Sequence, residues 1–147
     1  MAEAWPDLAG RLHQGAHRLP VRVYYEDTDA GGVVYHARYV AFCERARSDW
    51  LRLLGINQSE LADLFFVVRR MNCEFLKPAR LDDLLEIHTR LTAMAGARIE
   101  IDQQVMLNGN SVFRAEVTIA LVDGRGKPRR LPDDLAKRLG TVQESHS

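Results

Sequence analysis

The chain has 147 residues, of which 46% are apolar and 27% charged, a composition typical of one globular domain and too apolar for a disordered chain. Its 20 basic side chains balance its 20 acidic ones, so no net field favours nucleic acid, and no nucleic-acid partner is expected. No apolar run approaches the ~18 residues that a membrane-spanning helix needs.

The first 20 residues mix charge and proline with scattered apolar residues, and they lack the apolar centre of a signal peptide. We therefore predict a loosely ordered lead-in at 1–20, one folded domain at 21–140, a tail at 141–147 and a cytoplasmic location. The two cysteines, Cys43 and Cys73, lack metal-ligand spacing, which predicts that both pack in the core. No metal or organic cofactor is expected.

The first predicted element is a strand at 21–25, which ends in the polar turn 26–32. A long amphipathic helix follows at 36–54, because apolar or small residues recur three or four positions apart. Gly55 stands where a helix C′ residue is expected. The predicted apolar face comprises Ala37, Val40, Cys43, Ala46, Trp50, Leu53 and Leu54. The predicted polar face carries Arg38, Arg45, Asp49 and Arg52.

Strand-like segments then follow at 66–76, 85–93, 99–107 and 112–122, and tight turns separate the last three. One strand, one long helix and four more strands with short connections predict an α+β fold, an antiparallel sheet of about five strands packed on one central helix. A single helix cannot cover the apolar faces of five such strands. We therefore expect a homodimer or a larger homo-oligomer.

The segment YYEDTDAGGVVYHARY at 24–39 places two aspartates and a glycine pair before the long helix. The first N–H groups of a helix have no partner inside it and can stabilise an oxyanion, and a nearby carboxylate can attack the same carbonyl carbon or activate water against it. An aspartate in this position is, however, more often a cap or turn residue, and the glycines can serve only to turn the chain. The spacing alone leaves both interpretations open.

The sequence resembles the hotdog-fold thioesterases of the 4-hydroxybenzoyl-CoA type, and within them the acyl-CoA thioesterases associated with the Tol-Pal system. The resemblance is carried by VRVYYEDTDAGGVVYHARYVAFCERAR at 21–47 and by FVVRRMNCEFLKPARLDDLLEIHT at 66–89. The final strands match more loosely. Nearly all of the chain after residue 20 is covered.

This resemblance implies that Asp29 is the essential aspartate and that Asp27 is a turn residue. It implies that the backbone amide of His36 polarises the thioester carbonyl, with its imidazole nearby to orient substrate or water. Gly32, Val34 and Tyr35 are then expected to meet the substrate at the start of the helix. A purely structural role for the Tyr35 ring remains an equal alternative.

Another branch of hotdog thioesterases carries its acting carboxylate on the long helix, which makes Glu44 a reserve candidate. The phosphates of coenzyme A need cationic partners, and the basic segment 125–130 offers Arg129 and Arg130. Arg69, Arg70 and Lys77 are further candidates. Against this assignment, a basic loop is usually a solvated surface.

The resemblance implies hydrolysis of acyl-CoA to a free acid and coenzyme A by a homotetramer built from two dimers. An alternative is a non-catalytic module that binds acyl-CoA or acyl carrier protein and helps to organise phospholipid synthesis at the inner membrane, in association with the Tol-Pal system. A dehydratase of the same fold, which acts on β-hydroxyacyl thioesters, is a third reading.

Overall fold

The computed structural model of the protein describes residues 9–57, 59 and 61–144, with side chains described as far as Gly140. It contains six β-strands, two α-helices and one short 3₁₀ helix. In chain order these are β1 (Arg11–His13), β2 (Ala16–Arg22), the 3₁₀ helix η1 (Tyr25–Asp27), α1 (His36–Leu53), β3 (Phe65–Phe75), β4 (Leu84–Ala95), β5 (Arg98–Leu107), β6 (Asn110–Val122) and α2 (Asp133–Glu144).

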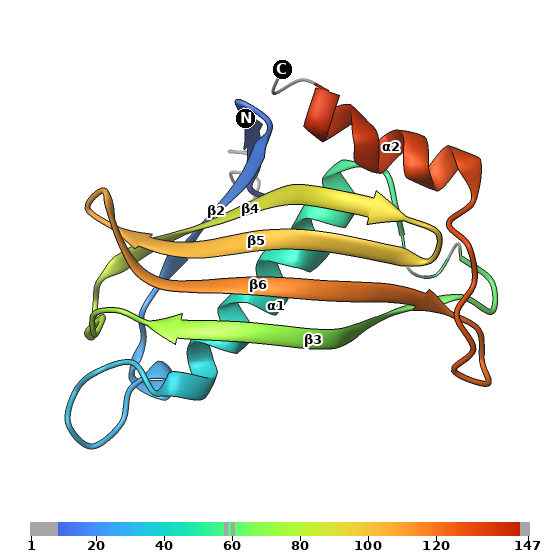
Figure 1. Ribbon diagram of the computed structural model, residues 1–147. Helices are drawn as coiled ribbons and strands as arrows, with labels where there is room; N and C mark the ends of the chain where they lie inside the picture. Colours follow the sequence, from blue (N-terminus) through green and yellow to red (C-terminus); the bar gives the residue numbers. More distant parts are fainter. Residues whose placement is uncertain (1–8, 58, 60, 145–147) are drawn as a thin grey trace, which may run out of the picture.

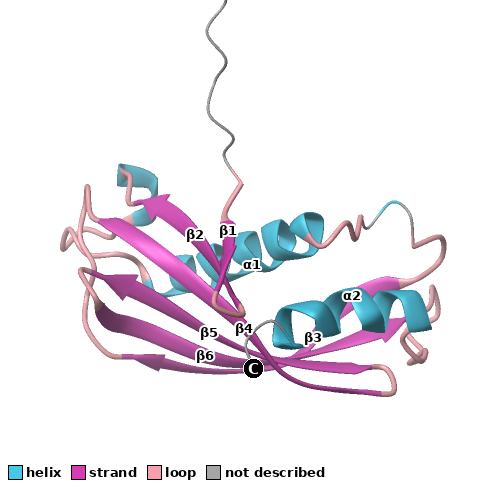
Figure 2. Ribbon diagram, turned by 90° about the horizontal axis from the view of Figure 1, so that it is seen from above, coloured by secondary structure: helices cyan, strands magenta, loops and turns pink. Residues whose placement is uncertain are grey.

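The strands form one antiparallel sheet in the order β1-β2-β4-β5-β6-β3. Helix α1 lies along one face of this sheet, and the two make separate layers when seen from above (Figures 1 and 2). The arrangement confirms the predicted α+β hotdog fold. The sheet has six strands rather than about five, because the three-residue strand β1 adds to its edge.

The core lies between α1 and the inward-facing residues of β4 and β5. Burial alternates along these two strands in step with the alternation of apolar and polar residues in the sequence. Two polar side chains stand among the inward-facing residues, Thr89 and Gln103, and both are fully buried. The Gln103 amide donates hydrogen bonds to Thr89 Oγ1, 2.9 Å away, and to the backbone oxygen of Cys43, 3.0 Å away. The sheet is thereby tied to the middle of α1.

The buried face of α1 differs from the predicted one. Tyr39, Phe42 and Asp49 are buried, whereas Val40 and Leu53 are more than a third exposed. The large aromatic rings therefore determine which side faces the sheet. The end of the helix was predicted correctly, since Gly55 has a φ of 77° and its N–H donates to the Arg52 carbonyl 3.0 Å away.

The two cysteines differ in burial. Cys43 is fully buried on α1, and burial raises the pKa of its thiol to about 12, which makes it unreactive at neutral pH. Cys73 is only half-buried, although burial also raises the pKa of its thiol. The prediction of a core position is confirmed for the first cysteine and holds in part for the second.

The N-terminal boundary was predicted too late. The strand expected at 21–25 runs instead over Ala16–Arg22, and Tyr24 and Tyr25 are exposed. A two-residue turn, Gln14-Gly15, with both φ angles positive, connects it to β1 as a hairpin. Residues 9–20 thus belong to the fold rather than to a loose lead-in, whereas residues 1–8 lie outside the described part.

Helix α2 was not predicted. Its sequence signals are Pro132, the acidic pair at the helix start and leucines four positions apart. Leu135 and Leu139 are buried, and α2 lies by β4 and the end of α1 (Figure 1). The helix extends to Glu144, so it includes the first part of the expected tail.

A buried polar pair joins β2 to the last turns of α1. His17 is fully buried, and its Nε2 lies 2.6 Å from Asp49 Oδ2. The same oxygen accepts the Gly10 N–H at 2.7 Å, and Arg52 donates to the other oxygen. Burial lowers the pKa of His17 against the opposing effect of Asp49, so the imidazole is neutral and donates its Nε2–H. Asp49 had been expected on the polar face of the helix.

Candidate active site

The loop between β2 and α1 is fixed by Asp27, which is buried inside it. Its carboxylate accepts the Tyr24 N–H at 2.9 Å and the Arg38 guanidinium through Nε at 2.9 Å and Nη2 at 2.6 Å. Its backbone oxygen accepts the Tyr35 N–H at 2.8 Å. Both the capping of η1 and the position of the helix start therefore depend on this one residue, as the turn assignment implies.

Asp29 lies two residues further on and is exposed. Its Oδ1 accepts the Gly31 N–H at 2.8 Å and, more weakly, the Val33 N–H at 3.4 Å. Its Oδ2 has no hydrogen-bond partner among the residues that the structure describes. The loop thus orients the carboxylate through one oxygen and leaves the other available for a reacting group.

The first turn of α1 begins directly after this loop. Tyr35 is the N-cap residue, and its side chain makes no capping hydrogen bond. Within the described ranges, the backbone N–H of His36 also has no partner. The positive end of the helix dipole lies at the same point, so this N–H can donate to a developing oxyanion.

Aromatic rings flank this helix start. The His36 ring lies 4.4 Å from the ring of Tyr35 and contacts Phe75, at the end of β3, edge-on at 6.2 Å. About half of the surface of each of these neighbours is exposed, at 48% for Tyr35 and 54% for Phe75. No sequence pattern indicated Phe75, because only the sheet brings β3 to this point.

The other two loop residues expected to meet substrate have different environments. Gly32 is exposed, adopts a φ of 79° and has open space where a Cβ would lie, so a ligand can approach its backbone. Val34 is buried in the core, and its N–H donates to the Ala79 carbonyl at 2.8 Å. Its side chain therefore anchors the loop.

Arg129 and Arg130 lie at the opposite end of the molecule, in the segment between β6 and α2 (Figure 1). Both are exposed, and Arg129 Nε lies 3.0 Å from Asp123 Oδ2. The structure does not bring them to Asp29 within one chain. Near this segment, a groove of about 480 Å³ on the sheet is lined by Arg69, Arg70 and Arg98.

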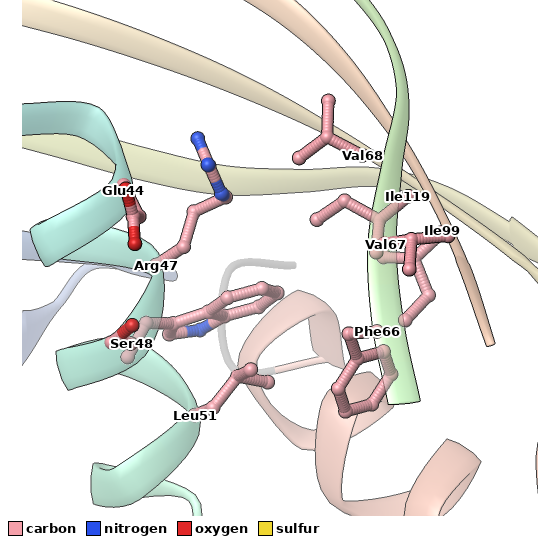
Figure 3. A pocket seen from close by; sticks show the side chains of 10 residues that line it. Glu44, Arg47, Ser48, Leu51, Phe66, Val67, Val68, Ile99 and Ile119 are labelled. Atoms are coloured by element: carbon pink, nitrogen blue, oxygen red, sulfur yellow. The ribbon is translucent and has the colours of Figure 1, made fainter. Parts of the chain in front are cut away.

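Glu44 is exposed on α1, two turns after His36. It lies at a cavity of about 390 Å³ between α1 and β3, together with Arg47, which sequence reasoning had not singled out (Figure 3). The structure therefore separates Glu44 from the Asp29 loop within one chain. Among the described residues, no three His, Cys, Asp or Glu side chains gather in a group that could hold a metal ion.

Comparisons with known proteins agree with this geometry. Residues 31–114 match the family described as Thioesterase superfamily. The acyl-CoA thioester hydrolase YbgC of Escherichia coli is 51% identical over 122 residues, which span 80% of this chain and 91% of that protein. The acyl-CoA thioesterase YbgC of Haemophilus influenzae is 47% identical over 80% of this chain and 89% of its own.

Solved structures show the same fold. A probable thioesterase from Bartonella henselae superimposes with a TM-score of 0.76 at 47% identity, and the match covers 80% of this chain and 99% of that one. A Thermus thermophilus thioesterase, solved with coenzyme A and zinc, gives a TM-score of 0.78 at 25% identity over 86% of this chain and 93% of its own. In the described part of this chain, no helix is both long and apolar enough to span a membrane.

Proposed function

The chain belongs to the thioesterase superfamily, and we propose that it hydrolyses acyl-CoA thioesters to a free acid and coenzyme A. One observation carries the proposal. Asp29 offers an exposed carboxylate with an available oxygen, His36 offers a helix N–H that no described residue bonds, and both belong to the same short loop–helix junction. Such a pair supplies a base or nucleophile together with an oxyanion donor.

In the proposed reaction, the thioester carbonyl oxygen accepts the His36 N–H, and the carbonyl carbon faces Asp29 Oδ2. As a base, Asp29 takes a proton from water while the water oxygen attacks the carbon. The tetrahedral intermediate then collapses, the carbon–sulfur bond breaks, and the proton passes to the departing thiolate. As a nucleophile, Asp29 Oδ2 attacks the carbonyl carbon, the carbon–sulfur bond breaks, and the coenzyme A thiolate leaves behind an anhydride. Water hydrolyses this anhydride in a second step, which restores the Asp29 carboxylate, gives the free acid and supplies the proton that the thiolate takes up.

Two measurements test this chemistry. Release of free thiol from a panel of short, medium, long and aromatic acyl-CoAs tests hydrolysis itself, and bound coenzyme A without release would contradict it. A single turnover in heavy-oxygen water separates the two roles of Asp29. Label in the protein carboxylate identifies the anhydride route, whereas label only in the product acid is the result expected of the base route.

The substrate is proposed to lie over Gly32 and between the rings of Tyr35 and Phe75, with Val34 holding the loop from beneath. The exposed faces of these rings support this placement, because they offer apolar contact to the pantetheine arm. We assign the coenzyme A phosphates to the basic end of a neighbouring subunit, where Arg129, Arg130 and the arginine groove lie.

A homodimer is proposed through β3. Among the described strands it pairs with β6 alone, so an edge of eleven residues carries backbone groups that a second copy can bond. Phe65, Val68 and Phe75 on it are about half exposed. Two such dimers would form the expected homotetramer, and light scattering that found a monomer at micromolar concentration would contradict both assemblies.

The cellular setting is proposed from the resemblance of the sequence to Tol-Pal-associated thioesterases. We place the enzyme in the cytoplasm, peripheral to the inner membrane, with acyl carrier protein or lipid-synthesis enzymes as partners. Cell fractionation and affinity capture with a tagged chain test this placement. An enzyme found only in the soluble fraction, without these partners, would contradict the peripheral placement and the proposed partners, and it would leave the hydrolase proposal intact.

A further inference from the structure

A cavity between α1 and β3 combines apolar walls with one oriented cation. Its volume is about 390 Å³, and its lining includes the apolar Trp50, Phe66, Ile99 and Ile119 together with the polar Glu44 and Ser48. The Arg47 side chain extends from α1 into the space that faces Val68 on β3 (Figure 3). A cavity that combines apolar walls with a few placed polar groups is the usual form of a small-molecule subsite.

The orientation of Arg47 is determined from the core. Its Nη1 donates to Gln103 Oε1 at 3.0 Å. Gln103 cannot turn its amide around, because its nitrogen is engaged by Thr89 and by the Cys43 carbonyl. The only remaining direction for the amide oxygen is toward the cavity side of α1, where it holds the guanidinium.

The guanidinium keeps most of its hydrogen-bonding capacity. It has five N–H donors, and one bond to a neutral amide uses a single donor. In the described part of the chain, Arg47 forms no ion pair within 4.0 Å, although the exposed carboxylate of Glu44, one turn earlier, lines the same cavity. Burial lowers the pKa of Arg47, and the nearby carboxylate of Glu44 opposes this shift. A half-buried cation of this kind is best matched by a carboxylate.

The cavity and the thioester site lie apart in one chain, because Arg47 follows His36 by eleven helical residues, about 16 Å along the axis. Antiparallel pairing of β3 with a second copy changes this relation. The start of β3, with Phe66 and Val68 in the cavity wall, would then lie opposite the end of β3 in the second copy, where Phe75 contacts His36. The cavity of one subunit would open beside the thioester of the other.

We propose that Arg47, held in place by Gln103, selects acyl groups that carry a carboxylate at the end remote from the thioester. The inference rests on the proposed acyl-CoA hydrolysis and on the β3 dimer, and it names a dicarboxylic acyl-CoA as the preferred substrate class. The apolar walls meet the methylene chain, and the guanidinium meets the terminal carboxylate.

The test compares matched substrates with acyl chains of equal length, adipyl-CoA with hexanoyl-CoA and suberyl-CoA with octanoyl-CoA. The ratio of kcat/KM within a pair measures selection for the carboxylate. We expect the wild-type ratio to exceed the ratio of Arg47→Met by about tenfold or more. Arg47→Lys keeps the charge without the planar fork and should give an intermediate ratio. Arg45→Met, an exposed change on the same helix, is the matched control and should leave the ratio unchanged.

The wild-type ratios test the inference by themselves, because they do not depend on whether any variant folds. Hydrolysis of hexanoyl-CoA without a preference for adipyl-CoA would overturn this inference and leave the proposed function standing. Hydrolysis of neither substrate, nor of other acyl-CoAs, would instead overturn the proposed function. A folded Arg47→Met with an unchanged ratio, or one that becomes monomeric, would assign Arg47 to the subunit interface and also overturn the inference.

Discussion

The two ends of helix α1 both carry polar groups, but they use them differently. At the C-terminal end, Asp49 accepts hydrogen bonds from His17, Gly10 and Arg52 and is buried. At the N-terminal end, Asp29 is exposed with one oxygen available, and the adjacent His36 N–H has no partner in the described residues.

In this contrast, the buried carboxylate contributes to stability and the exposed one is available for chemistry. A buried carboxylate whose hydrogen bonds are all made holds two elements together, and it has no capacity left for a substrate. A carboxylate held through one oxygen is already oriented, and a reacting group can use the other. The same difference recurs within the loop before α1, where Asp27 is buried and ion-paired although it lies only two residues from Asp29.

The largest expected effect is that of Asp29→Asn. We expect kcat for acyl-CoA hydrolysis to fall by a factor on the order of 100 or more, because an amide can neither attack nor accept a proton. The amide oxygen can still accept the Gly31 N–H, so the fold should remain. Thiol release and thermal unfolding measure the two quantities separately. Retention of most activity with every acyl-CoA would refute the assignment, and Glu44 would be the next carboxylate to test.

Asp27→Asn should show the opposite pattern. The change removes the charge that pairs with Arg38 inside the loop, and we expect a loss of about 2 kcal/mol in the free energy of unfolding. Urea unfolding measures this loss, while kcat should change far less than in Asp29→Asn. A large fall in kcat without a fall in stability would show that the two aspartates act together in the reaction.

The His17–Asp49 pair should make stability depend on pH. Burial lowers the pKa of His17 in the folded protein below its ordinary value of 6.5. As the pH falls through 6.5, the unfolded chain therefore binds a proton that the folded protein does not bind, and stability drops as the pH goes from 7 to 5. Burial opposes ionisation of Asp49, but hydrogen bonds from His17 and Gly10 outweigh it and lower the pKa of Asp49. Its contribution is lost only at lower pH.

His17→Gln tests this dependence, because the glutamine amide can donate to Asp49 without titrating. We expect the unfolding free energy to depend less steeply on pH between pH 7 and pH 5, by at most the uptake of one proton. His13→Gln, on the exposed strand β1, is the matched control and should keep the slope. An unchanged slope in His17→Gln would show that His17 is protonated in the folded protein over this range.

The strands with clear alternation and the long helix could be predicted from the sequence, because burial on one face imposes a period that local reading detects. The start of β2 could not be predicted, because His17 looks like an exposed polar residue in the sequence. Its burial is explained only by Asp49, which the structure places beside it. The face of α1 was predicted in part, since Cys43, Ala46 and Trp50 are buried, but Asp49 was placed on the polar face for the same reason. A buried charge on a helix is recognised only when its partner from another element is known.

For the candidate site, the contiguous segment 24–39 left a catalytic and a capping role open, and the family resemblance then indicated Asp29 and His36, whose roles remain predictions. Phe75 and Arg47 were not indicated, since each takes its role from contacts across the sheet, to His36 and to Gln103. Local patterns carry information about loops and helix ends. Cavities are formed by residues far apart in the chain.

The smallest expected effect concerns coenzyme A binding at the basic end of the molecule. Changing Arg129 and Arg130 together to glutamine should raise KM severalfold with little change in kcat, if these residues meet phosphate in a neighbouring subunit. Arg129 is already paired with Asp123 on an exposed surface, and such pairs contribute little to stability, so the fold should tolerate the change.

The comparison variant changes Arg69 and Arg70 to glutamine, which removes two cations from the sheet groove of about 480 Å³. Neither of these arginines forms an ion pair in the part of the chain that the structure describes, because Glu100, which also lines the groove, pairs with Arg98 at 3.6 Å, whereas Arg129 is partly neutralised by Asp123. The groove should therefore attract phosphate more strongly, and we expect its variant to raise KM more than the loop variant does.

Steady-state kinetics with one acyl-CoA at low and moderate salt measures both changes, and salt should reduce the difference between them. An unchanged KM in the loop variant would assign Arg129 and Arg130 to the solvated surface, and an unchanged KM in both would place the phosphates elsewhere on the subunit.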